Sequence, residues 1–206
     1  MENNIDEKVS PLTKDMVTSE KNKEGTFKQG LWDLIKFAVI ALAIVFPIRM
    51  FIAQPFVVQG DSMYPTFHTG QYLIVDELSY SLKGPQRGDV VIFKYPHDPS
   101  RYFIKRIIGM PNEKVVINDG KVSIANKENP KGFNLTEPYI NEKFNVTNTY
   151  TTGDDQFFVM GDNRNRSSDS REWGLLPRKL MVGRAYVRLL PIADAAYLPG
   201  AYKEVK

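Results

Sequence analysis

The chain has 206 residues, a formal net charge of +3 at pH 7 and no cysteine. Its length accommodates one or two small domains with a hydrophobic core. The lack of cysteine excludes disulfides, thiolate metal sites and a cysteine nucleophile. The small positive charge does not indicate a nucleic-acid partner. We therefore expect no nucleic acid, no metal and no cofactor.

Residues 1–30 are rich in charged and small polar residues and poor in large apolar ones. Such a segment buries too little apolar surface to offset its chain entropy, so we predict a disordered tail. Residues 34–53 are apolar, with Lys36 and Arg49 near the ends and Trp32 just before them. About 20 residues at about 1.5 Å each span a bilayer, so residues 31–54 are predicted to form one transmembrane helix.

The uncharged centre of this segment, residues 37–48, would also fit a buried helix or the core of a cleaved signal peptide. The long polar segment before it argues against a signal peptide. Lysines precede the span, whereas residues 51–82 contain no Lys or Arg. The distribution of positive charge therefore predicts a single-pass plasma-membrane protein with a cytoplasmic N-terminus and an extracytoplasmic domain after about residue 53.

Beyond the span, the pattern is typical of a mainly β protein. Runs rich in β-branched and aromatic residues recur at 56–58, 72–75, 89–95, 101–109, 114–117, 156–160 and 182–190. Residues 118–120, Asn-Asp-Gly, predict a hairpin turn into a strand at 121–124. We expect an antiparallel β-sheet domain over residues 55–117 and 156–192, a small β-rich peripheral insertion at 118–155 and a C-terminal tail at 193–206.

The stretch QGDSMYPTF, residues 59–67, places a serine, Ser62, just beyond the predicted span. It lacks the Gly-x-Ser-x-Gly pattern, so a nucleophilic Ser62 needs a base from elsewhere in the chain. Only two histidines, His68 and His97, are present. A Ser-His-Asp triad stays open because its members need only meet in space. Neither histidine lies in a recognisable motif, and the simpler interpretation is two exposed loop side chains.

A lysine can replace histidine as the base if its pKa falls toward neutrality, and burial has this effect. Lys105 lies in YFIKRII, where Phe103 and Ile107 share its face of a predicted strand. Such a lysine is either buried or extends to water at a strand edge. Lys94, nearer a strand end and a proline, is the competing candidate.

Residues 160–174, MGDNRNRSSDSREWG, form the third polar cluster. The simplest interpretation is a solvated loop. However, Asp169 and Arg171 alternate between an apolar strand and Trp173, which also fits a buried ion-pair network that stiffens a site.

Together these segments resemble one family. An apolar span is followed in order by QGDSMYPTF, RGDVVIF, RYFIKRIIG and GDNRNRSSDSREWG. In this order the chain resembles the bacterial type I signal peptidases, specifically the short single-span kind of Gram-positive bacteria, over residues 34–190. The resemblance implies a membrane-bound serine endopeptidase with a Ser/Lys dyad. It would cut N-terminal signal peptides from exported preproteins after small, Ala-x-Ala-like residues at the outer membrane surface.

The same resemblance assigns roles to individual residues. Ser62 would be the nucleophile, Lys105 the general base, and Ser167 a hydrogen-bond partner that orients the lysine. Supporting and pocket residues would follow by position: Asp162, Asp169 and Arg171 would hold the loop, and Val58, Met63, Phe67, Phe103 and Ile104 would line the substrate pocket.

One position departs from the pattern. Some family members carry a serine two residues before the nucleophile, whose hydroxyl helps to bind the oxyanion, and here that position is Gly60. The oxyanion hole is therefore expected to use backbone N–H groups, chiefly that of Ser62. Two other functions stay open: a self-cleaving Ser/Lys peptidase of the repressor-cleaving family, and a membrane-tethered β domain that binds peptides without catalysis.

Overall fold

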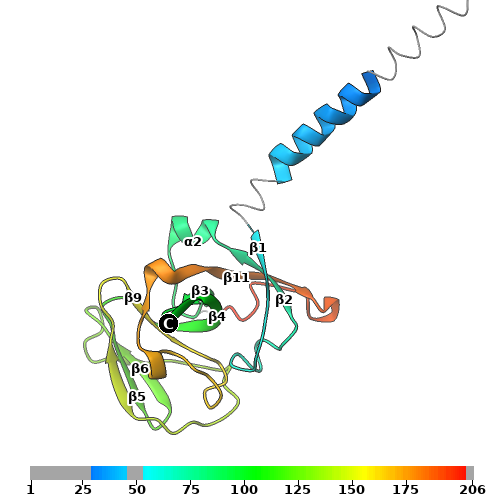
Figure 1. The fold of residues 1–206 in the computed structure, drawn as a ribbon. Helices are drawn as coiled ribbons and strands as arrows, with labels where there is room; N and C mark the ends of the chain where they lie inside the picture. The colour runs from blue at the N-terminus through cyan, green and yellow to red at the C-terminus, as the bar shows by residue number, and fades with distance from the viewer. Residues whose placement is uncertain (1–28, 46–52, 203–206) are drawn as a thin grey trace, which may run out of the picture. The chain divides into compact units, whose positions relative to one another are not determined.

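The computed structural model describes residues 29–45 and 53–202, except for the side chains of Ala53 and Ser79. The chain divides into two units, Met1–Ile48 and Arg49–Lys206, and each is described separately (Figure 1). The second unit contains all the described strands.

The described part of the first unit is one helix over residues 29–45. Its large apolar side chains are exposed, from Ile35 at 44% to Phe37 at 72%. None of the helices in residues 29–45 and 53–202 is long and apolar enough to cross a membrane. The predicted tail, apart from Gln29 and Gly30, and residues 46–52 of the predicted span lie outside the described residues.

The second unit is built on antiparallel sheets, so the predicted fold class is confirmed for this part of the chain. The larger sheet has the order β1-β2-β11-β3-β4-β9-β10, and β12 pairs with β11. Its strands are β1 (Ala53–Val57), β2 (Tyr72–Asp76), β3 (Val90–Tyr95), β4 (Asp98–Gly109), β9 (Gln156–Met160), β10 (Leu176–Pro177), β11 (Met181–Leu190) and β12 (Ala196–Tyr197).

The smaller sheet has the order β7-β6-β5-β8. It comprises β5 (Lys114–Asn118), β6 (Lys121–Ala125), β7 (Phe133–Asn134) and β8 (Asn148–Thr151), and thus begins four residues before the predicted insertion. The turn between β5 and β6 has positive φ at Asp119 and Gly120, which is the backbone twist that a two-residue hairpin requires. Apolar side chains from β4, β5, β6 and β9 form one buried cluster that joins the two sheets.

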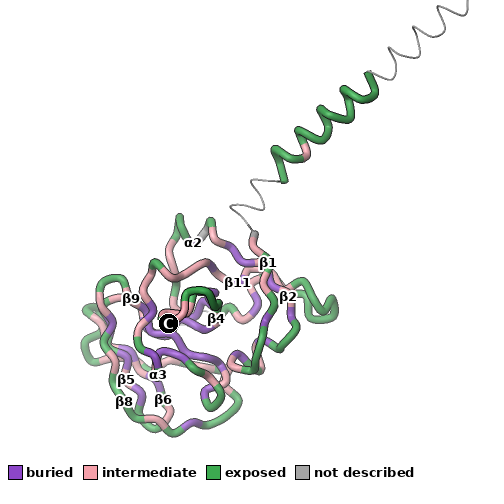
Figure 2. Tube along the Cα trace, viewed as in Figure 1, coloured by how far each residue is buried: buried purple, intermediate pink, exposed green. Residues whose placement is uncertain are grey.

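The helices of the second unit are short: α2 (Leu78–Lys83), α3 (Ser170–Trp173), and the 3₁₀ turns η1 (Arg178–Leu180) and η2 (Ile192–Asp194). Figure 2 shows the buried residues along the inner strands of the unit, with exposed residues at the loops. A second apolar cluster packs β3, β4 and β9 against Trp173 of α3. The chain segment after β9 is therefore fixed to the sheet by its own aromatic side chain.

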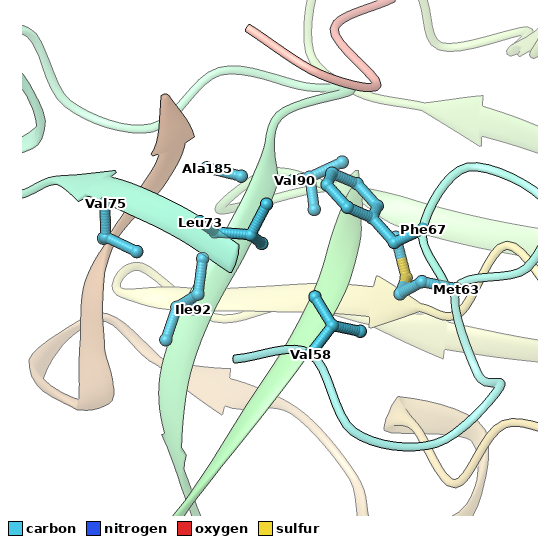
Figure 3. Packing of buried hydrophobic residues seen from close by; sticks show 8 residues of the cluster. All are labelled: Val58, Met63, Phe67, Leu73, Val75, Val90, Ile92 and Ala185. Carbon is cyan, nitrogen blue, oxygen red and sulfur yellow. The ribbon is translucent and has the colours of Figure 1, made fainter. Parts of the chain in front are cut away.

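A third apolar cluster lies under the loop that follows β1 (Figure 3). Met63 and Phe67 come from this loop and are 1% and 0% exposed, packed with Leu73, Val90 and Ile92. Full burial of these two side chains, each contributing about 1.5–3 kcal/mol, anchors the loop that carries Ser62.

Two strand edges are left without a strand partner in the described part of the chain. β1 pairs only with β2. β4 pairs with β3 from Tyr102 to Arg106, but its other neighbour, β9, pairs only from Arg106 onward. Residues 101–105 of β4 therefore present backbone N–H and C=O groups on one side. The rings of Phe56 on β1 and Tyr102 on β4 lie 5.3 Å apart, so the two edges are neighbours.

Candidate active site

Ser62 and Lys105 meet at the edge of the larger sheet, although 43 residues separate them in sequence. Nζ of Lys105 lies 2.8 Å from Oγ of Ser62, within hydrogen-bond distance. Nζ also donates to the carbonyl oxygen of Ile104 at 2.8 Å. An amine held between a hydroxyl and a carbonyl can keep one contact as a donor and use its lone pair, once deprotonated, toward the hydroxyl.

Lys105 is the only one of the competing bases that is removed from water. Lys105 is 4% exposed, whereas Lys94, His68 and His97 are all exposed. Burial lowers the pKa of Lys105 from 10.5 to about 8, against the opposing effect of the Asp169 and Asp162 carboxylates. Roughly a tenth of the lysine is therefore neutral at pH 7, and the fraction rises with pH.

The backbone of Ser62 is held by the loop after β9. The amide of Asn163 donates to the carbonyl oxygen of Ser62 at 3.0 Å. A Cβ atom at Gly161 would lie 2.4 Å from that same oxygen and 2.2 Å from Oγ of Ser167. Only glycine therefore lets the two chain segments approach so closely at this position.

Ser167 lies beside the pair but does not form the predicted hydrogen bond with Lys105. Its Oγ is buried and has no hydrogen-bond partner among the described residues. Nζ instead contacts Oγ of Ser62 and the carbonyl oxygen of Ile104, both at 2.8 Å. A buried, unpaired hydroxyl next to the carbonyl of Ser62 is a polar group left available in the site.

Asp162 is paired with a residue that the sequence did not identify, Arg106. Its carboxylate accepts from Nε of Arg106 at 2.8 Å and from Nη2 at 2.6 Å, and both side chains are at most 1% exposed. The signal was present in the alternation of β4: Lys105 and Arg106 are consecutive and face opposite sides of the strand. Two consecutive cations in an apolar strand each need a distinct buried environment.

Asp169 and Arg171 form a second ion pair, with two contacts at 2.8 Å. Asp169 also accepts from the backbone amide of Gly161 at 3.0 Å and caps α3 by accepting from the amide of Arg171. Arg171 in turn donates to the carbonyl of Arg164 at 2.7 Å. The loop is therefore internally cross-linked rather than solvated, and it ends on the glycine that contacts Ser62.

A cavity of about 580 Å³ opens beside Ser62 and Lys105, between β1 and β4. Of the five predicted pocket residues, Val58, Phe103 and Ile104 line it. Met63 and Phe67 do not line it, because both side chains point into the core. Sequence reasoning missed several lining residues, since the pairing of edges decides them: Phe56, Val57, Leu73, Ile92, Arg101, Tyr102, Arg166 and Ser168.

A serine hydroxyl beside a buried lysine, next to a cavity flanked by open strand edges, is the arrangement of serine hydrolases that use lysine in place of histidine. Comparison with known proteins refines this class. The family described as signal peptidase, peptidase S26, matches residues 31–190. The chain belongs to this family and is a serine endopeptidase, as the resemblance predicted.

Two relatives in sequence agree with the family assignment, and one solved structure aligns with part of the chain. The chain is 34% identical to a probable signal peptidase I-2 of Synechocystis, over 91% of this chain and 86% of that protein. It is 31% identical to a signal peptidase I of Bacillus licheniformis, over 89% of this chain and 97% of that protein. A crystal structure of a signal peptidase I from Enterococcus faecalis aligns with 48% of this chain and 95% of its own, at 30% identity and a TM-score of 0.41.

Proposed function

We propose that this protein is a membrane-bound signal peptidase that cleaves signal peptides from exported preproteins with a Ser62/Lys105 dyad. The observation that carries the proposal is the 2.8 Å contact between Oγ of Ser62 and Nζ of a lysine that is 4% exposed. Burial makes the neutral amine accessible near pH 8, and a neutral amine can accept the hydroxyl proton.

In the proposed reaction, Lys105 removes the proton of Ser62 as Oγ attacks the scissile carbonyl. The backbone N–H of Ser62 donates to the resulting oxyanion, a type of interaction whose loss costs about 3–4 kcal/mol in other hydrolases. The lysine ammonium then protonates the leaving amine, and water hydrolyses the ester on Ser62. Gly60 has φ of +82°, where an L side chain is strained, so this site favours an oxyanion hole made by the backbone.

The substrate is proposed to bind as an extended strand between the free edges of β1 and β4. Main-chain hydrogen bonds to these edges supply affinity without dependence on sequence. The cavity wall next to the dyad is formed by large apolar side chains, among them Val58, Leu73 and Ile104. These leave room for small residues before the cleaved bond, which is the Ala-x-Ala pattern of secretory signal peptides.

The apolar segment at residues 34–53 is proposed to anchor the protein in the plasma membrane, with the N-terminus in the cytoplasm. Supporting this, the described helix at residues 29–45 exposes ten large apolar side chains. Its seventeen residues rise about 26 Å, compared with the about 30 Å of hydrocarbon in a bilayer. With this topology, the dyad is proposed to act on the outer side of the membrane, where translocated signal peptides are cut. Lipid and preproteins are then the partners of the chain.

Cleavage of a precursor tests the catalytic proposal. Detergent-solubilised full-length protein is incubated with a precursor carrying an Ala-x-Ala signal peptide. We expect one size shift, which is lost in Ser62→Ala and Lys105→Ala and kept in the matched control Lys94→Ala, an exposed lysine of β3. A wild-type protein that binds the precursor without cutting it would instead indicate a peptide-binding domain. Full activity of either dyad variant would refute the dyad.

Cysteine labelling tests the topology, because the chain contains no cysteine. Ser19→Cys and the exposed Ser100→Cys are each treated in intact cells with a membrane-impermeant maleimide. We expect labelling of the cysteine at 100 alone. Labelling of the cysteine at position 19 in intact cells would contradict a cytoplasmic N-terminus.

A further inference from the structure

The last described residues of the chain are docked onto the second unit. We define residues 198–202 as the C-terminal strap. The amide of Leu198 donates to the carbonyl of Tyr186 on β11 at 2.7 Å, and Pro199 is buried. Tyr202 packs edge-on against Tyr139, with ring centroids 5.9 Å apart. A Cβ atom on Gly88 would lie 2.6 Å from the carbonyl oxygen of Tyr202, so the strap and the turn before β3 are in close contact.

The middle of the strap, at Gly200, contacts the guanidinium of Arg106. Nη1 of Arg106 donates to the carbonyl of Gly200 at 2.5 Å and to the carbonyl of Gly88 at 2.9 Å. The ring of Tyr139 covers the guanidinium at 3.9 Å. Because Nε and Nη2 are used by Asp162, the strap carbonyl satisfies part of the remaining donor capacity of a side chain that is 1% exposed.

Asp162 carries this connection toward Ser62. It lies between Gly161, which contacts the carbonyl of Ser62, and Asn163, whose amide donates to that carbonyl at 3.0 Å. Asp162 also accepts a hydrogen bond from the hydroxyl of Thr66, four residues after Ser62. One carboxylate thus holds both the loop that grips the nucleophile and the loop that carries it.

The same arginine borders the base. Arg106 follows Lys105 on β4, and its bidentate contact with Asp162 fixes that point of the strand. We propose that the C-terminal strap is a positioning element of the active site, which keeps Ser62 and Lys105 in reacting geometry by holding Arg106 on Asp162. This inference rests on the proposed function, because it assigns the strap a role in the rate of that reaction.

Gly200 offers a substitution that displaces the strap. Its φ is +75°, and an added Cβ would lie 2.6 Å from Cγ2 of Thr66 and 3.2 Å from atoms of Phe67 and Val90. Gly84 is a matched control, because its φ is +71° and a Cβ there would meet nothing within 4 Å. Gly200→Ala and Gly84→Ala share the backbone strain of a positive φ and differ in whether the strap must move.

The experiment measures kcat, KM and the unfolding midpoint of the full chain with a secretory precursor. We expect Gly200→Ala to lower kcat on the order of 10- to 100-fold with KM within about twofold, since misplacement of reacting groups acts on the chemical step. Gly84→Ala should keep wild-type kcat. The double variant Thr66→Ser/Gly200→Ala should recover part of the loss, because serine removes the clashing methyl group and keeps the hydroxyl that donates to Asp162.

A pair of truncations gives an independent measurement. A chain ending at Tyr202 should retain kcat, whereas a chain ending at Tyr197 should lose it to the same extent as Gly200→Ala. Wild-type kcat in Gly200→Ala or in the shorter chain would overturn the proposal. A loss that merely equals the unfolded fraction at the assay temperature would also overturn it, by showing a structural fastener only. If the wild-type chain itself fails to cut the precursor, the proposed function fails first, which separates the two results.

Discussion

Lys105 and Arg106 are neighbours on β4, both cationic and both buried, yet their environments differ in one respect. Arg106 contacts a carboxylate directly, with two hydrogen bonds to Asp162. The two hydrogen bonds of Lys105 go to neutral oxygens, the hydroxyl of Ser62 and the carbonyl of Ile104. Burial lowers the pKa of Lys105 to about 8, whereas for Arg106 the effect of burial is outweighed by Asp162, which raises the pKa above its ordinary value.

The presence or absence of a contacting carboxylate explains why two neighbouring cations of β4 differ in pKa. A buried cation keeps its charge when a carboxylate contacts it and gains access to its neutral form when none does. The charged partner fixes geometry, and the neutral one is suited to accept a proton. Substitutions at Lys105, Arg106 and their acidic neighbours test whether the two cations differ in this way.

The largest effect is expected for removal of the proposed base. Lys105→Met keeps the length and apolar character of the side chain but cannot accept a proton, so kcat/KM should fall by at least about 10³-fold. Lys105→Arg should be equally inactive, because a guanidinium does not deprotonate in proteins. Steady-state cleavage of a precursor measures both. Activity of Lys105→Arg above about a tenth of wild type would show that position 105 needs only a positive charge.

Substitution of Arg106 should lower the stability of the protein as well as its activity. Arg106→Met leaves the Asp162 carboxylate buried without its partner, which we expect to cost about 3–5 kcal/mol in the free energy of unfolding. Urea unfolding of the full chain in detergent, followed by tryptophan fluorescence, measures it. Arg106→Met combined with Asp162→Leu should restore most of the loss. A single variant as stable as wild type would mean that this pair is not the buried clamp inferred from its 1% and 0% exposure.

A smaller and opposite effect on stability is expected at Lys105. Its folded pKa of about 8 lies below its ordinary 10.5, so between these values the unfolded chain binds more protons and the free energy of unfolding rises with pH. Below about pH 8 Lys105 is charged in both states, and the wild-type protein carries the full free-energy cost of burying that charge. Lys105→Met should then be more stable by about 1–3 kcal/mol at pH 7, and its advantage should shrink as pH rises from 8 to 10.5. An advantage that is constant over this range would contradict a buried, titrating lysine.

Much of this arrangement could be predicted from sequence, because local patterns determine it. The strands follow from β-branched runs between turn residues, and the hairpin at Asp119 and Gly120 follows from turn chemistry. The order of motifs around Ser62 and Lys105 indicated the family. The alternation of Asp169 and Arg171 left a solvated loop and an ion-pair network both open, and the two residues form an ion pair.

Contacts between distant segments were not predictable in the same way. The partner of Asp162 is 56 residues away, and only the antiparallel pairing of β4 with β9 brings Arg106 to it. Met63 was predicted to line the pocket because it follows Ser62, but the turn directs its side chain into the core. Gly200 contacts Arg106 across 94 residues, and no local pattern marks that glycine as part of the site.

The pH dependence of cleavage tests whether Lys105 titrates as the base. With a pKa of about 8, roughly a tenth of Lys105 is neutral at pH 7, so kcat/KM there should be about a tenth of its plateau at higher pH. The rate should rise through an acid limb near pH 8 in the free enzyme. An acid limb near pH 6.5 would instead point to a histidine, and a flat profile between pH 6 and 9 with chemistry limiting would exclude a titrating base.

The smallest effect is expected from an acid that influences Lys105 without contacting it. The carboxylate of Asp169 raises the pKa of Lys105 against the larger effect of burial. Asp169→Asn should therefore move the acid limb to lower pH, because removing the negative charge removes a stabilising effect on the ammonium form of Lys105 and so lowers its pKa. Asp98→Asn, at a half-buried acid at the other end of β4, is the control and should leave the limb in place. If the acid limb of Asp169→Asn stayed at the wild-type pH, the Asp169 carboxylate would not raise the pKa of Lys105, and the proposed electrostatic environment of this lysine would be wrong.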